Sequence, residues 1–347
     1  MRLHLRRQKA CQSDEVKNSI NLLDFSVTSH DRERYCRLMA AQIKTFSAFG
    51  KSSARIAVLL LLQVALVGAF WSSPAWAKGP TCSALTTGND ISYPQCGKSF
   101  PSGQAFGIVG VNDGLANNAN PCLGPYNGGG ASTSELYWAQ MTSSGTPSQP
   151  KAQLYVNTAD PGNSVADWPK ASNTSDAYGS CTTVSNGTIG ANSTACAWQY
   201  GYNMASYDAG LLANAAEALN NSSIPGSVWS YFWWLDVETA NSWQAGSLGE
   251  EMNLAVLQGM AYVFGPARTP IRPNVGVYST SYQWGEIVGS VSGTFLGALE
   301  DVNVWLPGAR SEGAAASNCT ATAFTGGKVT VTQWFSHPFD SDYSCVG

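Results

Sequence analysis

The stretch SVWSYFWWLDVETANSW, residues 227–243, decides the fold of this chain. Its first half is apolar and aromatic, and the run ends on two acidic residues, Asp236 and Glu238, where a polar loop begins. Side chains alternate along a strand, so both carboxylates should lie on one side of it, with their β-carbons about 6.5 to 7 Å apart. The residues of opposite parity should pack against helices instead, namely Trp233, Leu235 and Val237.

Similar apolar, β-branched runs alternate with helical patterns along the chain. We expect strands at residues 90–92, 106–112, 152–157, 228–238, 274–279, 302–306 and 329–334. We expect helices at residues 132–142, 202–220, 248–264 and 281–288, and a long disulfide-pinned loop at 159–198. This alternation predicts the α/β class, with a single TIM-barrel-like (β/α) domain of about seven to eight strands. Acids that end a strand of such a barrel lie at its mouth, where active sites form.

The N-terminal part predicts export. An apolar run at residues 56–70 follows several basic residues and precedes the sequence Ala75-Trp76-Ala77, which is the order of a signal peptide. We expect cleavage after this site, which makes residues 1–77 the signal region and residues 78–347 the barrel domain. The alternative is an uncleaved signal anchor, although the apolar run is short for a membrane span.

Residues 1–38 do not fit a signal peptide, because they are polar and carry mixed charge. Met39 is a better beginning, so we interpret residues 1–38 as the product of a mis-called start codon and residues 39–77 as the signal peptide. The mature protein is then expected to be secreted, extracellular or associated with the cell wall. We expect a monomer with no membrane contact after signal cleavage.

The domain after the signal region is acidic. Residues 1–77 hold 11 of the 19 Lys and Arg but 5 of the 23 Asp and Glu, so 8 basic and 18 acidic side chains remain, a net charge of −10. This balance excludes nucleic acid as a partner, because nucleic-acid binding needs a basic surface. Charged residues are sparse, and small polar and aromatic residues are abundant, as in secreted polysaccharide-active domains.

Seven cysteines follow the signal region, and export predicts that they form disulfides. None has a C-x-x-C partner, so a metal site is not expected. Proximity in the sequence favours two pairs, Cys181–Cys196 and Cys319–Cys345. The third pair is either Cys96–Cys122, which leaves Cys82 unpaired, or Cys82–Cys96.

Histidine chemistry is limited to one residue. His4 and His30 lie in the signal region, which leaves His337 in the mature domain. The chain has no H-E-x-x-H, G-x-S-x-G or G-x-x-x-x-G-K-[ST] motif. If the domain is an enzyme, its acid and base are therefore carboxylates, with no metal and no organic cofactor.

Other acids lie at the ends of the chain's first and last strands. Asp90 stands in GNDISYPQC at the first strand, and Asp340 and Asp342 stand in HPFDSDYSC after the last expected one. First and last strands are neighbours in a closed barrel, so these acids can join Asp236 and Glu238 at the mouth. Repulsion and desolvation in such a cluster raise the pKa of one carboxyl, which gives the neutral acid that glycosidic bond cleavage needs.

Aromatic side chains near strand ends are candidates for contacts with sugar rings, namely Tyr93, Trp243, Tyr278, Trp284, Trp305 and Trp334. Each of them alone is more often a core residue than a sugar platform. A single acid at a strand end likewise often caps a helix or lies in a solvated loop. A close acid pair that ends an apolar strand is harder to explain without a function, because burying it costs free energy.

The order of these motifs resembles the family 25 glycoside hydrolases, the barrel-type lysozymes that cleave peptidoglycan, and related domains of secreted bacterial proteins. GNDISYPQ is similar to an opening D-x-S-x-x-Q, and LDVE to a central D-x-E. VGVYST, VWLPGA and VTVTQW with FDSDYS resemble the later strands and the Asp-rich turn. The resemblance covers most of the mature chain.

This resemblance implies roles for the acids. Glu238 would be the general acid, and Asp236 its electrostatic partner or the stabiliser of an N-acetyl-derived intermediate. Asp90 and Asp342 would belong to the surrounding cluster. The sugar groove would be lined by Tyr93, Tyr278, Trp284, Trp305 and Trp334.

The chain departs from this pattern at three places. Gln333-Trp334 reverses the usual W-Q order, Tyr343 replaces an Asn, and residues 159–198 have no counterpart. A weaker comparison is with the family 18 chitinases, whose D-x-x-D-x-D-x-E motif is half present here. We therefore expect a hydrolase that acts on peptidoglycan or a similar chitin-like N-acetylated glycan. The alternative is a catalytically silent barrel that binds cell-wall glycan or serves as an envelope scaffold.

Overall fold

A computed structural model describes residues 86–114, 116–146, 148–174, 177–265, 274–290 and 293–346. Every described residue belongs to one compact unit, Ala84–Gly347. The expected signal region, the start at Met39 and Cys82 lie outside the described residues. Within the described part, no helix is both long enough and apolar enough to cross a membrane.

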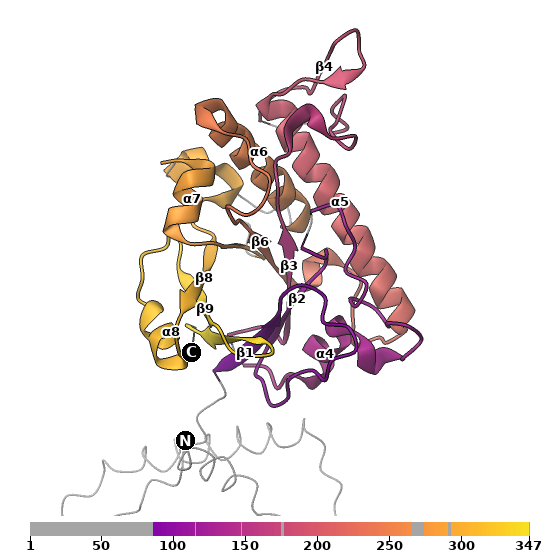
Figure 1. Ribbon diagram of the computed structural model, residues 1–347, viewed down its shortest axis with the longest axis vertical. Helices are drawn as coiled ribbons and strands as arrows, with labels where there is room; N and C mark the ends of the chain where they lie inside the picture. The colour runs from indigo at the N-terminus through magenta and orange to yellow at the C-terminus, as the bar shows by residue number, and fades with distance from the viewer. Residues whose placement is uncertain are drawn as a thin grey trace, which may run out of the picture. The chain divides into compact units, whose positions relative to one another are not determined.

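Eight strands form a closed barrel in the order β1-β10-β9-β8-β7-β6-β3-β2 (Figure 1). Their bounds are β1 (Thr87–Ile91), β2 (Gly107–Gly110), β3 (Ala152–Asn157), β6 (Phe232–Asp236), β7 (Val275–Tyr278), β8 (Asn303–Ala309), β9 (Val329–Trp334) and β10 (Asp340–Ser344). β10 runs antiparallel to both of its neighbours, and all other pairs are parallel. The expected α/β barrel is confirmed.

The last strand differs from the sequence prediction. The segment DSDYS was expected to be a turn after a final strand at 329–334, but it forms β10, which lies between β1 and β9. A short connection after β9 turns the chain back, so that Asp340–Ser344 bonds to both neighbours. The expected strand at 228–238 is also shorter, because Val228–Ser230 forms a 3-10 turn before β6 begins.

Within the described residues, five helices lie outside the strands (Figure 1): α4 (Glu135–Thr142), α5 (Thr194–Leu219), α6 (Gly246–Phe264), α7 (Ser281–Val288) and α8 (Glu312–Asn318). Four of them begin after a Ser or Thr whose side chain accepts a backbone N–H of the first turn, namely Ser134, Ser193, Thr280 and Ser311. α5 starts at Thr194 rather than at residue 202, because Ser193 caps the helix there. This cap lies inside the stretch that was expected to be a loop. α8 was not expected.

Short 3-10 segments complete the described helical structure: η2 (Ala131–Thr133), η3 (Gly162–Ser164), η4 (Val228–Ser230) and η5 (Gly293–Leu299). The stretch 159–198 also contains a small hairpin, β4 (Thr183–Val184) with β5 (Ile189–Gly190), which projects away from the barrel in Figure 1. A disulfide, Cys181–Cys196, connects this hairpin to the first turn of α5. The rest of the stretch is loop, as expected.

Alternation along the strands divides the apolar side chains into two cores. Trp233, Leu235 and Val237 are completely buried in the layer between the strands and the helices, as predicted. Side chains of the opposite parity fill the interior of the barrel, where Trp234 packs against residues such as Tyr155 and Trp305. The mouth of the barrel lies above this inner core.

Helices α5 and α6 pack against each other with their backbones in close contact. Two glycines permit this approach. A β-carbon at Gly201 of α5 would overlap the Val256 carbonyl oxygen, and one at Gly259 of α6 would overlap the Trp198 carbonyl oxygen. Reciprocal glycines therefore set the distance between α5 and α6.

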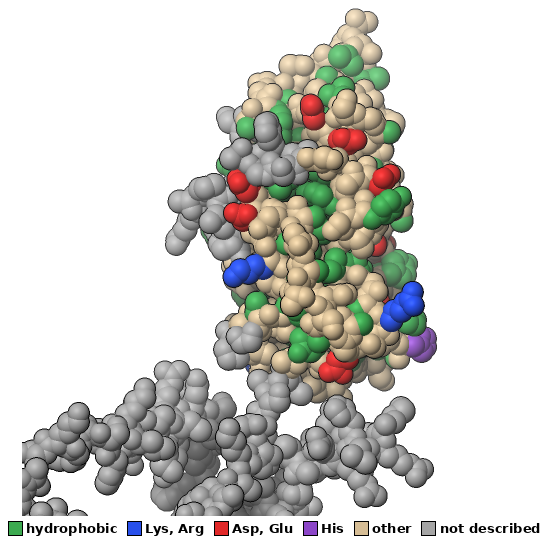
Figure 2. All heavy atoms as spheres, turned by 90° about the vertical axis from the view of Figure 1, so that its left-hand side faces the viewer, with side chains coloured by type: hydrophobic (Ala, Val, Ile, Leu, Met, Phe, Trp, Pro, Cys, Tyr) green, Lys and Arg blue, Asp and Glu red, His purple; other side chains and the backbone are tan. Residues whose placement is uncertain are grey.

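The two favoured disulfides form, Cys181–Cys196 and Cys319–Cys345. Of the two alternatives for the third pair, the structure has Cys96–Cys122. They are consistent with an extracellular or secreted protein, since disulfides persist in oxidising compartments. One face of the molecule, shown in Figure 2, carries mostly uncharged side chains with scattered acidic ones. This surface agrees with the sparse, acidic charge of the sequence.

Candidate active site

Asp236 is the last residue of β6, and Glu238 lies two residues beyond it. The register pairs Asp236 with Asn157 of β3 on one side and with Tyr278 of β7 on the other. The Asp236 carbonyl oxygen accepts the backbone N–H of Thr158 at 3.2 Å, and the Val237 N–H donates to the Tyr278 carbonyl at 2.9 Å. The neighbouring strands thus hold the end of β6 firmly, and with it the acid pair.

The Asp236 side chain is 8% exposed. Its Oδ2 accepts a hydrogen bond from Asn157 Nδ2 at 3.3 Å, and its Oδ1 has no partner among the described residues. Burial raises the pKa of Asp236 well above its usual range, and the charges of Glu238 and Asp90 raise it further, against the Asn157 bond. Asp236 therefore holds a proton, or needs a donor for Oδ1 when it is ionised.

Glu238 is half-buried and lies nearer to solvent. Its backbone carbonyl accepts the Trp243 indole N–H at 2.8 Å, which fixes the loop after β6. Burial raises the pKa of Glu238, although a hydrogen bond from Gln283 on α7 favours the charged form. Gln283 is itself held by the Thr239 N–H, which donates to its Oε1 at 2.8 Å. Glu238 is therefore a carboxyl of raised pKa that a substrate can reach.

A second acid pair lies on β1 and β10. The register places Gly88 opposite Asp342, and Asp90 opposite Asp340. Asp90 and Asp342 are buried inside the barrel, and their carboxyl groups are within hydrogen-bonding reach of each other. With both ionised, Asp342 Oδ2 has no donor, so a shared proton satisfies the pair.

Each member of this pair has a second partner. Gln333 Nε2 on β9 donates to Asp90 Oδ2 at 2.9 Å, and Trp305 Nε1 on β8 donates to Asp342 Oδ1 at 2.8 Å. Burial raises the pKa of Asp90 to about 7, partly offset by the Gln333 bond. Burial and the charge of Asp90 raise the pKa of Asp342 well above its usual range.

Tyr278 connects the two acid pairs. Its hydroxyl donates to Gln333 Oε1 at 3.0 Å, and Gln333 in turn donates to Asp90. Burial raises the pKa of Tyr278 strongly, and the negative charges of all four acids add to this effect: Asp236, Asp90, Glu238 and Asp342. The charges of the four acids predicted at the mouth therefore all act on the Tyr278 hydroxyl.

Tyr155 of β3 lies in the same interior. Burial and then the charges of nearby acids, Asp236 first, raise its pKa. The rings of Tyr278 and Trp305 lie 4.4 Å apart between centroids, and those of Tyr155 and Trp305 lie 6.4 Å apart. These rings form an apolar base beneath the carboxylates, which explains why the acids are so poorly solvated.

The predicted aromatic residues are not all at this site. Trp305 is 2% exposed and belongs to the barrel interior, while Tyr93 is 65% exposed after β1. Trp284 is buried among the helices, with its ring 5.1 Å from that of Phe324. Trp334 is half-buried on the outer face of β9, because its neighbour Gln333 takes the inward position. The acids are brought together, and the aromatics only in part.

Asp340 lies beside this cluster rather than within its buried part. Burial raises its pKa, and the Ser336 N–H donates to its Oδ1 at 3.2 Å, which lowers it. The side chain is half-buried and holds the connection between β9 and β10 in place.

Sequence reasoning missed the amide partners of the acids, namely Asn157, Gln283 and Gln333. It also missed Tyr155, whose hydroxyl donates to the Ile91 carbonyl in the same interior. Strand parity could have identified two of them, since Tyr155 and Asn157 alternate along a strand next to β6. Gln333 could have been found from the reversed Gln-Trp order, which directs the amide inward. No group of three or more His, Cys, Asp or Glu in the described part of the chain is arranged to hold a metal ion.

Comparisons of this chain with models of known families, with curated proteins and with solved structures found no match.

Proposed function

We propose that this protein is a secreted glycoside hydrolase that cleaves peptidoglycan or a similar N-acetylated glycan by carboxylate general acid catalysis. The observation that carries the proposal is the placement of two acid pairs in one closed barrel, Asp236 with Glu238 at the end of β6 and the buried Asp90 with Asp342 on β1 and β10. Glycosidic bond cleavage needs a carboxyl that keeps its proton near neutral pH beside one that can become charged. The motif order that resembles the family 25 lysozymes also supports this proposal.

Glu238 is the proton donor in this proposal. It is the most accessible of the four acids, and its pKa is raised by burial. The neutral carboxyl donates its proton to the glycosidic oxygen as the bond to the anomeric carbon breaks. Gln283, which bonds to the carboxyl, orients it and stabilises the carboxylate that remains.

Asp236 stabilises the intermediate. Its Oδ1 is buried and has no partner among the described residues, so it accepts the N–H of a substrate acetamido group once the groups that cover it move aside. That bond would orient the acetamido oxygen toward the anomeric carbon and stabilise the positive charge that develops there. The shared proton of Asp90 and Asp342 limits the negative charge beneath the substrate.

The test is release of reducing ends from purified peptidoglycan, and then from chitin, by wild type and by Glu238→Gln. We expect the variant to lose roughly 10² to 10⁴ in rate, because the amide cannot donate the proton. Glu251→Gln is the matched control, since Glu251 is an exposed glutamate on α6, and its rate should equal that of wild type. An unchanged rate for Glu238→Gln would overturn the assignment of the proton donor.

A catalytically silent, glycan-binding barrel is the second candidate. The observation that favours it is the burial of three of the four acids, each with a hydrogen-bond partner, as in a structural network. A folded wild type with intact disulfides that binds glycan but releases no reducing ends would favour this function. Both candidates place the protein in the cell wall or the medium, with a polysaccharide as partner.

A further inference from the structure

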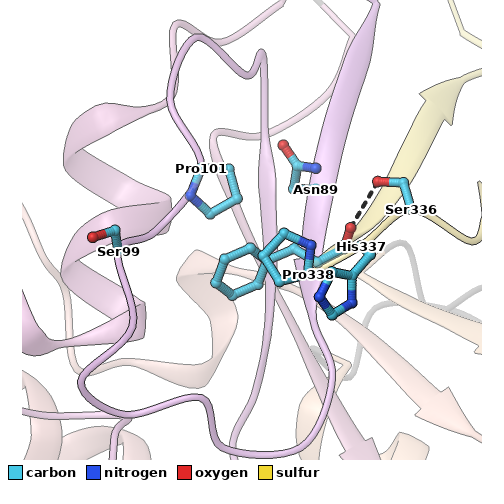
Figure 3. A pocket seen from close by; sticks show the side chains of 7 residues that line it. Asn89, Ser99, Pro101, Ser336, His337 and Pro338 are labelled. Atoms are coloured by element: carbon cyan, nitrogen blue, oxygen red, sulfur yellow. Dashed lines mark hydrogen bonds between the residues drawn. The ribbon is translucent and has the colours of Figure 1, made fainter.

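A pocket of about 260 Å³ lies on the outer side of β1, away from the acid cluster (Figure 3). Its lining comes from β1, the loop after β1 and the connection between β9 and β10: Asn89, Ser99, Pro101, Ser336, His337, Pro338 and Phe339. Asn89 points outward because its neighbour Asp90 points into the barrel. In Figure 3, Pro101 lies on one side of the hollow, and Pro338 and His337 lie on the other.

The walls of this pocket are held in place. Asn89 Nδ2 donates to the Asp340 carbonyl at 3.0 Å and to Ser341 Oγ at 3.2 Å. Ser336 Oγ donates to the Phe339 carbonyl at 2.8 Å, a bond drawn in Figure 3. These bonds fix the connection between β9 and β10 against β1, so the pocket is formed before any ligand arrives.

The lining has the chemistry of a sugar site. Pro101, Pro338 and Phe339 provide flat apolar surfaces, while Ser99 and His337 add a hydroxyl and an imidazole at the exposed side. Among the described residues, no Lys, Arg, Asp or Glu lines the pocket, which favours a neutral ligand. Its volume is just below the range of about 300 to 1,000 Å³ for drug-sized ligands, so it suits one pyranose ring rather than a disaccharide.

We propose that this pocket is an accessory site that binds one neutral pyranose unit of the glycan, outside the acid cluster. The inference rests on the proposed function for the identity of the ligand, but binding here does not require catalysis. Asn89 and Asp90 are adjacent on β1, so the accessory site and the acids lie on opposite faces of one strand. A glycan held at the mouth of the barrel can place one of its more distant sugar units over the accessory site.

The binding test uses the full-length protein and the trisaccharide of N-acetylglucosamine, followed by nuclear magnetic resonance of histidine ring protons. The His337 imidazole is assigned as the resonance that is present in the wild-type spectrum and missing from the spectrum of His337→Gln. We expect it to shift on titration of wild type and to stay unshifted in Ser99→Trp, which fills the pocket. Ser102→Trp places the same side chain three positions along the same loop, outside the lining, and should respond like wild type.

A wild-type resonance that does not shift overturns the proposal, as does an equal shift in Ser99→Trp and Ser102→Trp. Melting temperatures of both variants establish that they are folded. If Ser99→Trp fails to fold, the variant His337→Ala at an exposed position replaces it, and glycan binding is measured by calorimetry. A response in wild type without any turnover supports the accessory site and contradicts the proposed catalysis.

Kinetics give an independent test wherever turnover is measurable. Ser99→Trp should raise KM for long glycan about tenfold, the change expected from about 1.4 kcal/mol of lost binding free energy, and leave kcat unchanged. Turnover of wild type with no change of KM in Ser99→Trp contradicts the accessory site while the proposed function stands.

Discussion

Asp208 lies in the middle of α5, completely buried, and neither of its carboxylate oxygens has a hydrogen-bond partner among the described residues. Burial raises its pKa well above the usual range for aspartate. The folded state therefore holds this proton more tightly than the unfolded chain does. The stability gained from holding this proton is fully present below the ordinary aspartate pKa, and it is lost as the pH rises toward the raised pKa of Asp208.

Replacement of Asp208 by Asn should stabilise the protein at neutral pH and change little near pH 4. The amide cannot ionise, so the variant avoids a loss of about 1.4 kcal/mol for each pH unit between the two pKa values. Urea unfolding at several pH values measures the effect. Glu217→Gln, on the exposed side of the same helix, is the control and should follow wild type. A variant less stable than wild type at neutral pH would contradict the explanation.

Glu238 illustrates how much of a site single residues reveal. The i, i+2 spacing of Asp236 and Glu238 was sufficient to predict that both carboxylates face one side of a strand. It was insufficient to predict that Gln283 bonds to Glu238, because that contact comes from a helix far along the chain. Partners of this kind depend on how distant elements pack together, and the local spacing of residues does not reveal that packing.

At the level of elements, the close contact of α5 with α6 makes opposite predictions for different glycines. Gly201→Ala and Gly259→Ala should each destabilise the protein, because the new methyl group would overlap a carbonyl oxygen of the partner helix. Gly210→Ala, on an exposed position of α5 with open space around it, should stabilise by up to about 1 kcal/mol through helix propensity. Thermal unfolding of the three variants tests both directions, and equal effects would contradict the packing.

The elements with strong periodicity were predicted well, and those made by tertiary contacts were not. The strands at 152–157 and 329–334 and the helix at 281–288 have the predicted bounds. β10 was missed because DSDYS has the composition of a turn and gains its strand conformation from two neighbours. α5 was predicted too short because Ser193, one polar residue among many, is its cap.

For the molecule as a whole, several buried carboxyls act together. Burial raises the pKa of Asp90, Glu135 and Asp160 to about 7 in each case. All three hold protons in the folded state at pH values where the unfolded chain has released them. The stability that they contribute is therefore full near pH 4 and is lost as the pH rises to about 7.

We expect the melting temperature to be highest at mildly acidic pH and to fall between pH 5 and pH 7.5. High salt should not abolish this fall, because desolvation rather than long-range repulsion is the main cause of the raised pKa values. Calorimetry over this range at low and high salt measures both effects. A melting temperature that rises from pH 5 to pH 7.5 would contradict the protonated state assigned to these groups.

The reversed direction of β10 has a geometric consequence for attachment. β1 begins at the floor of the barrel and β10 ends there, so that the Ser344 N–H donates to the Thr86 carbonyl at 2.8 Å. The start of β1, where the chain enters the barrel, thus lies next to the end of β10, where it leaves, on the side opposite the mouth. A short covalent bridge between them would close the chain into a circle, and a support anchored at either point would leave the acids facing away from it.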